Sequence, residues 1–269
     1  MFSGRLRAGG ALIAGSALLG GCGLPHVEVV LHDRVEGAAA APATTAPAAP
    51  PVGPETTQTP QAPVTVRPVK YLHTGKNTWV VAAGKSAVSG SAGPVLRYQV
   101  AVERGIDGIT AKKFAGEVVK ILGDDRSWTG QGERRLRRVG PGQSADFTVR
   151  LTTPGTRDVL CGGTGGYTSC RNGDDVVINV ARWVHGVPDY PASLAVYRAY
   201  VINHETGHLL GHGHELCPGP GRLAPVMQQQ SLGMHGCRAN AWPSPKGKPL
   251  HGSAGEYDDP IPVERTGRN

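Results

Sequence analysis

The chain has 269 residues, of which 39% are hydrophobic and 18% charged, and its formal net charge is +7. No repeat of solenoid length occurs, and no second apolar run follows the N-terminal one that could cross a membrane, which argues against solenoids and multi-span membrane proteins. The densest basic cluster, residues 133–138, lies among Gly, Gln and Trp. We expect a solvated surface loop there, with cell-envelope polyanions as possible partners and no nucleic acid.

The N-terminus has the pattern of an export signal. Arg5 and Arg7 precede an apolar stretch at 11–19 that is too short to span a bilayer. The sequence LGGC, which ends at Cys22, resembles the bacterial lipoprotein box. This resemblance implies that residues 1–22 are a signal peptide and that a lipid on Cys22 anchors the protein outside the cytoplasmic membrane. The alternative is an ordinary secretion signal that contains a cysteine.

Composition divides the rest of the chain into three parts. Residues 23–68 are dominated by Ala, Pro and Thr, which cannot bury enough apolar surface to order the chain, so we expect a disordered tether. Residues 69–243 have the size and patterning of one folded domain. Residues 244–269 are polar and rich in Pro and Gly, which predicts a flexible tail.

Within the domain, the hydrophobic patterning predicts an α+β fold. Residues 95–103 and 146–151 alternate apolar and polar side chains, as half-buried strands do. Residues 175–183 contain a β-branched run that fits a buried strand. Residues 110–122 have helical periodicity, and a second, longer helix is expected over 191–210, with an apolar stripe along one face.

The end of that longer helix carries the motif H-E-x-x-H-x-x-G-x-x-H. His204 and His208 are four residues apart and therefore face the same way on a helix. Glu205 is placed to reach a water on an ion held by the two histidines. Gly211 can end the helix because glycine adopts the left-handed conformation without steric cost, and His214 can then turn back as a third ligand.

This motif resembles the zinc signature of the metzincin metallopeptidases. The resemblance implies that His204, His208 and His214 hold Zn²⁺, while Glu205 is the general base that takes a proton from the zinc-activated water. It also implies a small mixed sheet packed on helices, a long zinc-binding helix and a smaller C-terminal subdomain, where Met227 follows Pro225 in a Met-turn. More narrowly, residues 203–230 resemble an uncharacterised metzincin-like domain of secreted proteins from high-GC Gram-positive bacteria, a family that adds no known substrate.

The chain has five cysteines, so one would be left over in a secreted protein. Setting Cys22 aside leaves four, which allow three pairings in an oxidising compartment. We favour the neighbour pairs Cys161–Cys170 and Cys217–Cys237, of which the second would enclose the Met227 segment. A structural zinc site built from cysteines is the alternative, but no C-x-x-C spacing occurs.

Other polar residues near the motif receive simpler interpretations. We expect His212 to be exposed and His185 to be an ordinary loop histidine. Glu215 is either a solvated acid or a partner that orients a histidine ligand. The glycine-rich run at 161–167 lacks the Lys and Ser/Thr of a phosphate-binding loop and is expected to be flexible.

These observations favour a monomeric zinc-dependent endopeptidase that acts on peptide or protein substrates at the cell surface. Two alternatives stay open. One is a zinc-containing module that binds envelope components without turnover, and the other is a zinc amidase that acts on envelope material.

Overall fold

The computed structural model describes residues 68–163 and 165–265. The predicted signal peptide with Cys22, the tether up to residue 67 and the last four residues lie outside the described residues, so those expectations stay predictions. Over the described ranges, no helix has both the length and the apolar character needed to cross a membrane.

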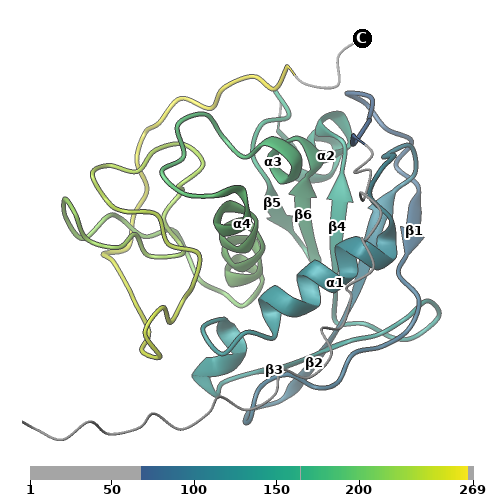
Figure 1. Ribbon diagram of the computed structural model, residues 1–269, viewed down its shortest axis with the longest axis horizontal. Helices are drawn as coiled ribbons and strands as arrows, with labels where there is room; N and C mark the ends of the chain where they lie inside the picture. The colour runs from purple at the N-terminus through teal and green to yellow at the C-terminus, as the bar shows by residue number, and fades with distance from the viewer. Residues whose placement is uncertain (1–67, 164, 266–269) are drawn as a thin grey trace, which may run out of the picture. The chain divides into compact units, whose positions relative to one another are not determined.

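A mixed sheet forms one layer of the fold (Figure 1). Its six strands lie in the order β1-β2-β4-β6-β5, with β3 paired to β2. β2, β4 and β6 pair in parallel, whereas β1 and β5 are antiparallel to their neighbours. Most residues of β4 and β6 are buried, as expected for parallel strands in the middle of a sheet. The strands are β1 (Trp79–Val81), β2 (Val95–Glu103), β3 (Arg135–Arg138), β4 (Phe147–Thr152), β5 (Cys170–Asn172) and β6 (Asp175–Asn179).

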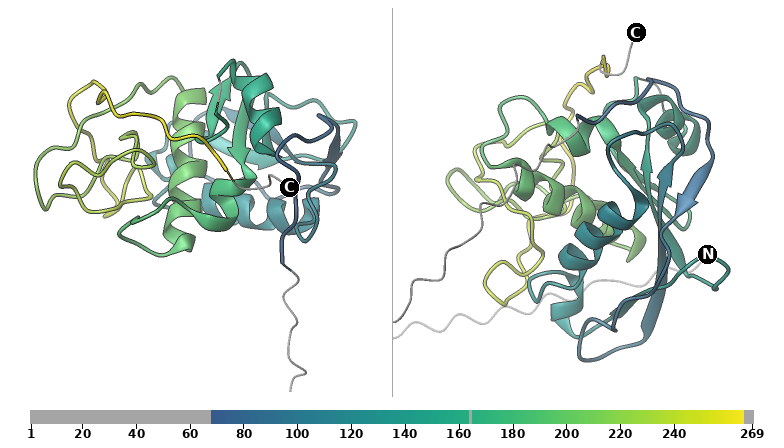
Figure 2. Two further views of the ribbon diagram at one scale, coloured as in Figure 1. Left: turned by 90° about the horizontal axis from the view of Figure 1, so that it is seen from above. Right: turned by 45° about the vertical axis from the view of Figure 1, so that its right-hand side comes forward.

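Two helices, α1 and α4, pack against each other and lie on one face of the sheet (Figure 2). The helices are α1 (Ala111–Leu122), α2 (Pro154–Cys161), α3 (Val180–His185) and α4 (Leu194–Leu209), with a short 3₁₀ turn, η1 (Trp128–Gln131). The Thr110 side chain caps α1 by accepting a hydrogen bond from the Lys113 amide. The α+β class and the mixed sheet predicted from the sequence are therefore confirmed.

Three details of the predicted elements are wrong. The cluster at 133–138 is not only a loop, because Arg135–Arg138 form β3 beside β2. The predicted strand 175–183 ends at Asn179, whose side chain accepts from the Ala181 amide and starts α3. The long helix begins at Leu194 instead of 191, because Ser193 caps it by accepting from the Val196 amide.

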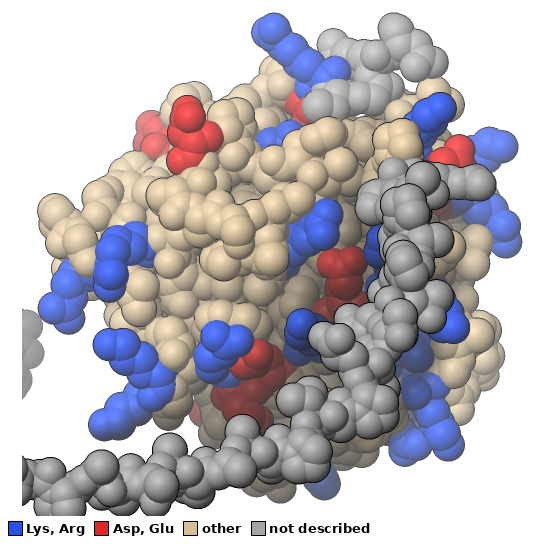
Figure 3. Space-filling model, in the orientation of Figure 1, with Lys and Arg blue, Asp and Glu red and all other residues tan. Residues whose placement is uncertain are grey.

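On the face seen in Figure 3, Lys and Arg side chains lie mainly toward the edges, with a few acidic side chains among them and a largely uncharged area between. β3 itself carries Arg135, Arg137 and Arg138, and Arg138 donates to the backbone oxygens of Ala82, Ala83 and Gly84. Arg138 of the basic cluster therefore stabilises the loop at residues 82–84 through these hydrogen bonds.

After α4, the described chain contains no further helix or strand, only turns and isolated bridges. Disulfides join Cys161 to Cys170 and Cys217 to Cys237, which are the neighbour pairs expected from the sequence. Residues 244–265 differ from the flexible tail that their composition predicts. They pack onto the domain, and the buried ion pair between Glu264 and Arg182 is one physical reason.

A buried glutamate at the end of β2 ties together segments that are distant in the sequence. Glu103 is 1% exposed, and its carboxylate accepts from the amides of Asn77 and Thr153 and from the hydroxyl of Thr156. Thr153 is the residue before α2 and Thr156 lies in its first turn. The carboxylate therefore fixes the start of α2, the helix that carries Arg157.

We expect Glu103→Ala to lower the free energy of unfolding by about 3 kcal/mol or more, because three donors lose their acceptor in a buried place. Glu103→Gln keeps one carbonyl oxygen and should lose about half as much. Chemical denaturation measures both. Glu117→Ala is the control, because its 3.5 Å contact with Arg198 is partly exposed and should change stability by less than about 0.5 kcal/mol. Equal losses of stability in Glu103→Ala and Glu117→Ala would contradict the stabilising role of the Glu103 carboxylate.

Candidate metal centre

The last two turns of α4 carry the first half of the motif. His204 and Glu205 are each 5% exposed, and His208 is partly buried one turn later. The helix ends at Leu209, and Gly211 has a φ of 97°, the left-handed conformation expected of it. The chain turns back there and brings His214 to the two histidines of the helix. The structure thus brings together the three histidines that the motif singled out.

Each of the three imidazoles is held through its Nδ1 atom by an oxygen that can only accept. The acceptor is the Val226 carbonyl for His204 (2.8 Å), the His212 carbonyl for His208 (2.9 Å) and the Glu256 carboxylate for His214 (2.7 Å). Nδ1 must therefore donate in all three rings. In the neutral form of each ring, Nε2 then carries a lone pair, which is the form of histidine that binds metals.

The three Nε2 atoms point at one another. His208 Nε2 lies 3.2 Å from His204 Nε2 and 3.1 Å from His214 Nε2. In rings that are neutral, with the proton on Nδ1, the Nε2 atoms carry no proton, and a cation between them would take up their lone pairs. A tetrahedral zinc with Zn–N bonds of about 2.0–2.1 Å would separate its nitrogens by about 3.3 Å. The residues present therefore fit a Zn²⁺ ion.

Burial sets the protonation of the cluster. It lowers the pKa of His204 to about 3, and it also lowers the pKa of His208. Both imidazoles are consequently neutral at neutral pH, as metal binding requires. Burial raises the pKa of Glu205 to about 8, while the charge of Arg157 acts in the opposite direction. A cation beside Glu205 would favour the ionised carboxylate in the same way as Arg157.

Met227 lies in a turn directly below this end of α4. It is 1% exposed, and the turn is closed by a hydrogen bond from the Gln228 amide to the Pro225 oxygen (3.1 Å). The preceding residue, Val226, supplies the acceptor for His204. The predicted turn at Met227 therefore both packs under the helix and orients one of the three histidines.

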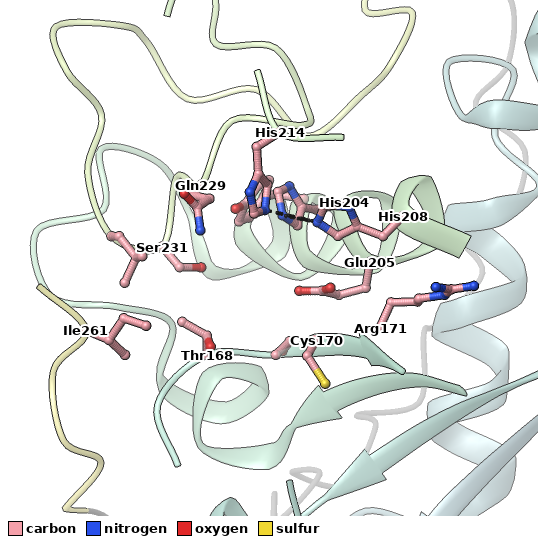
Figure 4. A pocket seen from close by; sticks show the side chains of 13 residues that line it. Thr168, Cys170, Arg171, His204, Glu205, His208, His214, Gln229, Ser231 and Ile261 are labelled. Atoms are coloured by element: carbon pink, nitrogen blue, oxygen red, sulfur yellow. Dashed lines mark hydrogen bonds between the residues drawn. The ribbon is translucent and has the colours of Figure 1, made fainter. Parts of the chain in front are cut away.

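The histidines and Glu205 line a cleft with a cavity of about 380 Å³ (Figure 4). Glu205 projects from α4 into this space beside the histidines, and β5 forms the opposite wall. Thr168, Cys170 and Arg171 line the β5 side, and Ser231 and Ile261 lie toward one end. The three-histidine cluster therefore opens onto this cleft.

The other candidates near the motif have structural roles. His212 is half-buried instead of exposed, because its ring stacks on Trp128 with 4.4 Å between the centroids. Glu215 does not orient His214, since its carboxylate contacts His251 (3.1 Å) and the Gly252 amide (3.1 Å). His185 is exposed at the end of α3 and is absent from the residues that line the described cleft.

Several residues that complete the site are not marked by any local sequence pattern. Glu256 and Ile261 lie in a segment whose composition suggested a loose tail. Arg157 reaches the cleft wall by donating to the Thr168 hydroxyl (2.9 Å). Trp128 donates from its indole to the Asn203 carbonyl (2.8 Å), which fixes the backbone just before His204. The contacts of Glu256 and Trp128 join positions 42 and 75 residues apart, and none of these contacts follows a local sequence pattern.

Fold and site together define an α+β protein with a three-histidine cluster that can hold a metal ion. The chain belongs to the DUF3152 family, described as a protein of unknown function, whose model matches residues 66–241. No curated protein and no solved structure matches the chain.

The contact between α4 and the Met227 turn depends on a glycine. A Cβ atom at Gly207 would lie 2.7 Å from Trp128 Cζ2 and closer still to Met227 Sδ. Glycine in a helix normally costs about 0.5–1 kcal/mol relative to alanine, so the substitution is favourable where space allows. At Gly207 we expect the steric conflict to exceed this gain.

Gly207→Ala should lower the free energy of unfolding of the metal-free protein by about 1–3 kcal/mol, because the added methyl group overpacks the contact with Met227 and Trp128. Gly116→Ala is a matched control in α1, where a Cβ atom meets nothing within 4 Å. It should raise stability by about 0.5–1 kcal/mol. Denaturant titration of both variants measures the difference, and stabilisation by Gly207→Ala would refute the close packing.

Proposed function

We propose that this protein is a zinc-dependent endopeptidase of the metzincin type. The observation that carries the proposal is the convergence of three Nε2 lone pairs beside a buried glutamate at the floor of a cleft. His204, His208 and His214 would hold the ion. The long α4, the glycine after it, the turn at Met227 and the lack of a further helix between α4 and residue 265 support the metzincin assignment.

A bound Zn²⁺ would supply a Lewis acid that polarises a carbonyl group and lowers the pKa of a water molecule. Glu205 is the base in this proposal. Its carboxylate accepts a proton from the attacking water as the new carbon–oxygen bond forms. It then delivers this proton to the amine nitrogen as the carbon–nitrogen bond breaks. Burial suits Glu205 to both roles, because it makes the carboxylate more basic.

The position of β5 favours an extended peptide as the substrate. β5 ends the strand order of the sheet, and in the described part of the chain it pairs only with β6. Cys170 and Arg171 of this strand line the cleft. The outer edge of a terminal strand offers backbone donors and acceptors to a peptide in extended conformation. A peptide bound there would run past the three histidines.

We further propose that the enzyme works outside the cytoplasmic membrane, held by a lipid on Cys22. The two disulfides of the folded domain support this location, because disulfides persist in oxidising compartments. Its other expected properties, a monomeric state and the absence of a nucleic-acid partner, belong to the same proposal.

The test compares the purified wild-type chain with Glu205→Gln, His208→Ala and Glu215→Gln. We expect one zinc per wild-type chain and hydrolysis of members of a peptide library. Glu205→Gln should keep the zinc but lose about 10²–10⁴-fold in rate, because it cannot accept the proton. His208→Ala should lose the zinc. Glu215→Gln is the matched control, because its carboxylate faces His251 and Gly252 instead of the cluster. Elemental analysis and mass spectrometry of the products provide the two measurements.

Three outcomes would contradict the proposal in different ways. A wild-type chain without zinc would exclude the metal site. Zinc in both proteins, with identical product profiles for wild type and Glu205→Gln, would instead indicate a binding module. Hydrolysis of amides in envelope material, with no cleavage of any library peptide, would indicate an amidase.

A further inference from the structure

Residues 250–265 form what we call the C-terminal strap, which begins beside the third histidine. The strap pairs with the segment that carries His214: the Leu216 amide donates to the Ser253 oxygen (2.8 Å), and the Gly255 amide donates to the His214 oxygen (3.0 Å). An antiparallel bridge joins Glu215 to Ala254. Backbone pairing thus sets the position of the strap next to one metal-ligand candidate.

The other end of the strap is fixed on the opposite side of the cleft. Glu264 forms an ion pair with Arg182 of α3, and the two side chains are 2% and 5% exposed. The Glu264 amide also donates to the Gly165 oxygen (2.6 Å). Burying Arg182 without a carboxylate partner would strongly destabilise the fold, so this attachment is part of the folded domain. The strap, yellow in Figures 1 and 2, therefore links the segment of His214, which lines the cleft, to α3 and Gly165.

Glu256 is the strap residue that reaches the metal centre. His204 and His208 are oriented by backbone carbonyls close to α4, whereas His214 donates to the Glu256 side chain (2.7 Å). The Glu256 side chain is 65% exposed, so few contacts of its own hold it in place. Its position depends instead on the backbone pairing of the strap. The next residue, Tyr257, also stacks its ring on His235.

Ile261 is the strap residue that reaches the substrate space. It lines the cleft although it is 57% exposed, and Figure 4 shows it at the end of the cleft opposite Arg171. Leu232 lines the same cavity. An exposed isoleucine in a cleft wall is suited to contact an apolar side chain of a bound ligand.

We propose that the C-terminal strap is a working part of the site: Glu256 positions His214 for metal binding, and Ile261 forms an apolar wall that selects the substrate side chain. The proposal rests on the proposed function, since it assigns residues to the same metal centre and cleft. Both residues lie beyond position 241, where the family match ends.

Glu256→Ala in the full-length chain should weaken Zn²⁺ affinity by about 10–100-fold, the usual effect of removing the partner of a histidine ligand. Glu256→Gln keeps an acceptor oxygen for Nδ1 and should restore most of the affinity. Asp259→Asn is the matched control, because this strap carboxylate contacts His235 (2.7 Å), which is outside the cluster. Competition with a chromogenic chelator measures the affinities, and denaturation of the metal-free proteins checks that folding is unchanged.

Equal zinc affinity in wild type and Glu256→Ala would overturn the role of Glu256. Equal losses in Glu256→Ala and Asp259→Asn would also overturn it, since the effect would then come from loosening the strap. Both results differ from a wild-type chain that binds no zinc at all, which would exclude the proposed function itself.

The role of Ile261 is tested with zinc-loaded full-length protein and peptide hydroxamates that carry a leucine or a lysine side chain. Ile261→Asp should reduce the preference for leucine over lysine by about tenfold or more, because it replaces apolar contact with charge. Val263→Asp is the control, because Val263 is 55% exposed on the same strap and is not among the residues that line the cleft. An unchanged preference in Ile261→Asp, or the same change in both variants, would overturn the assignment, and the binding measurement does not require catalysis.

Discussion

The orientation of three imidazole rings is the constraint on which the rest of the site depends. Each Nδ1 atom contacts an oxygen, and the Nε2 atoms of His204 and His214 both lie close to that of His208. The His208 ring also packs edge-to-face against the other two rings. Because the surrounding structure fixes all three rings in this orientation, a cation at the centre would meet nitrogen atoms that are already directed toward it.

The surrounding structure holds the rings by burying α4 on nearly all sides. From Tyr197 to Gly207, most of its residues are buried, so the helix does more than present one apolar stripe to a core. The sheet and α1 cover one side, while the turn at Met227 covers another. Asn203 links these layers, because its side chain accepts from the Ser127 hydroxyl and donates to the Ala241 carbonyl. A helix fixed in this manner cannot rotate, which keeps His204 and Glu205 directed into the cleft.

The sequence predicts those parts of the site that follow from local rules. Helical spacing places His204 and His208 together, and a glycine with positive φ returns the chain to His214. The same rules fail where tertiary contacts decide. The apolar run at 175–183 is equally compatible with strand and helix, and the side chain of Asn179 decides the change by capping α3 and binding the Gly166 and Tyr167 carbonyls. The carboxylate partners of His214 and Arg182 are 42 and 82 residues away in sequence, and no sequence periodicity predicts these contacts.

Those two contacts show that the folded domain extends past the segment that matches the family. The family match covers residues 66–241, and within it Arg182 is a buried charge and His214 a ring with a donor to satisfy. Both groups find their carboxylates in the C-terminal strap. Because an unpaired buried charge is costly, the matched segment is physically incomplete without residues up to Glu264. The polar, Pro- and Gly-rich composition of the strap is compatible with this role, since an extended segment that is held by backbone pairing at one end and by a buried ion pair at the other needs little apolar surface of its own.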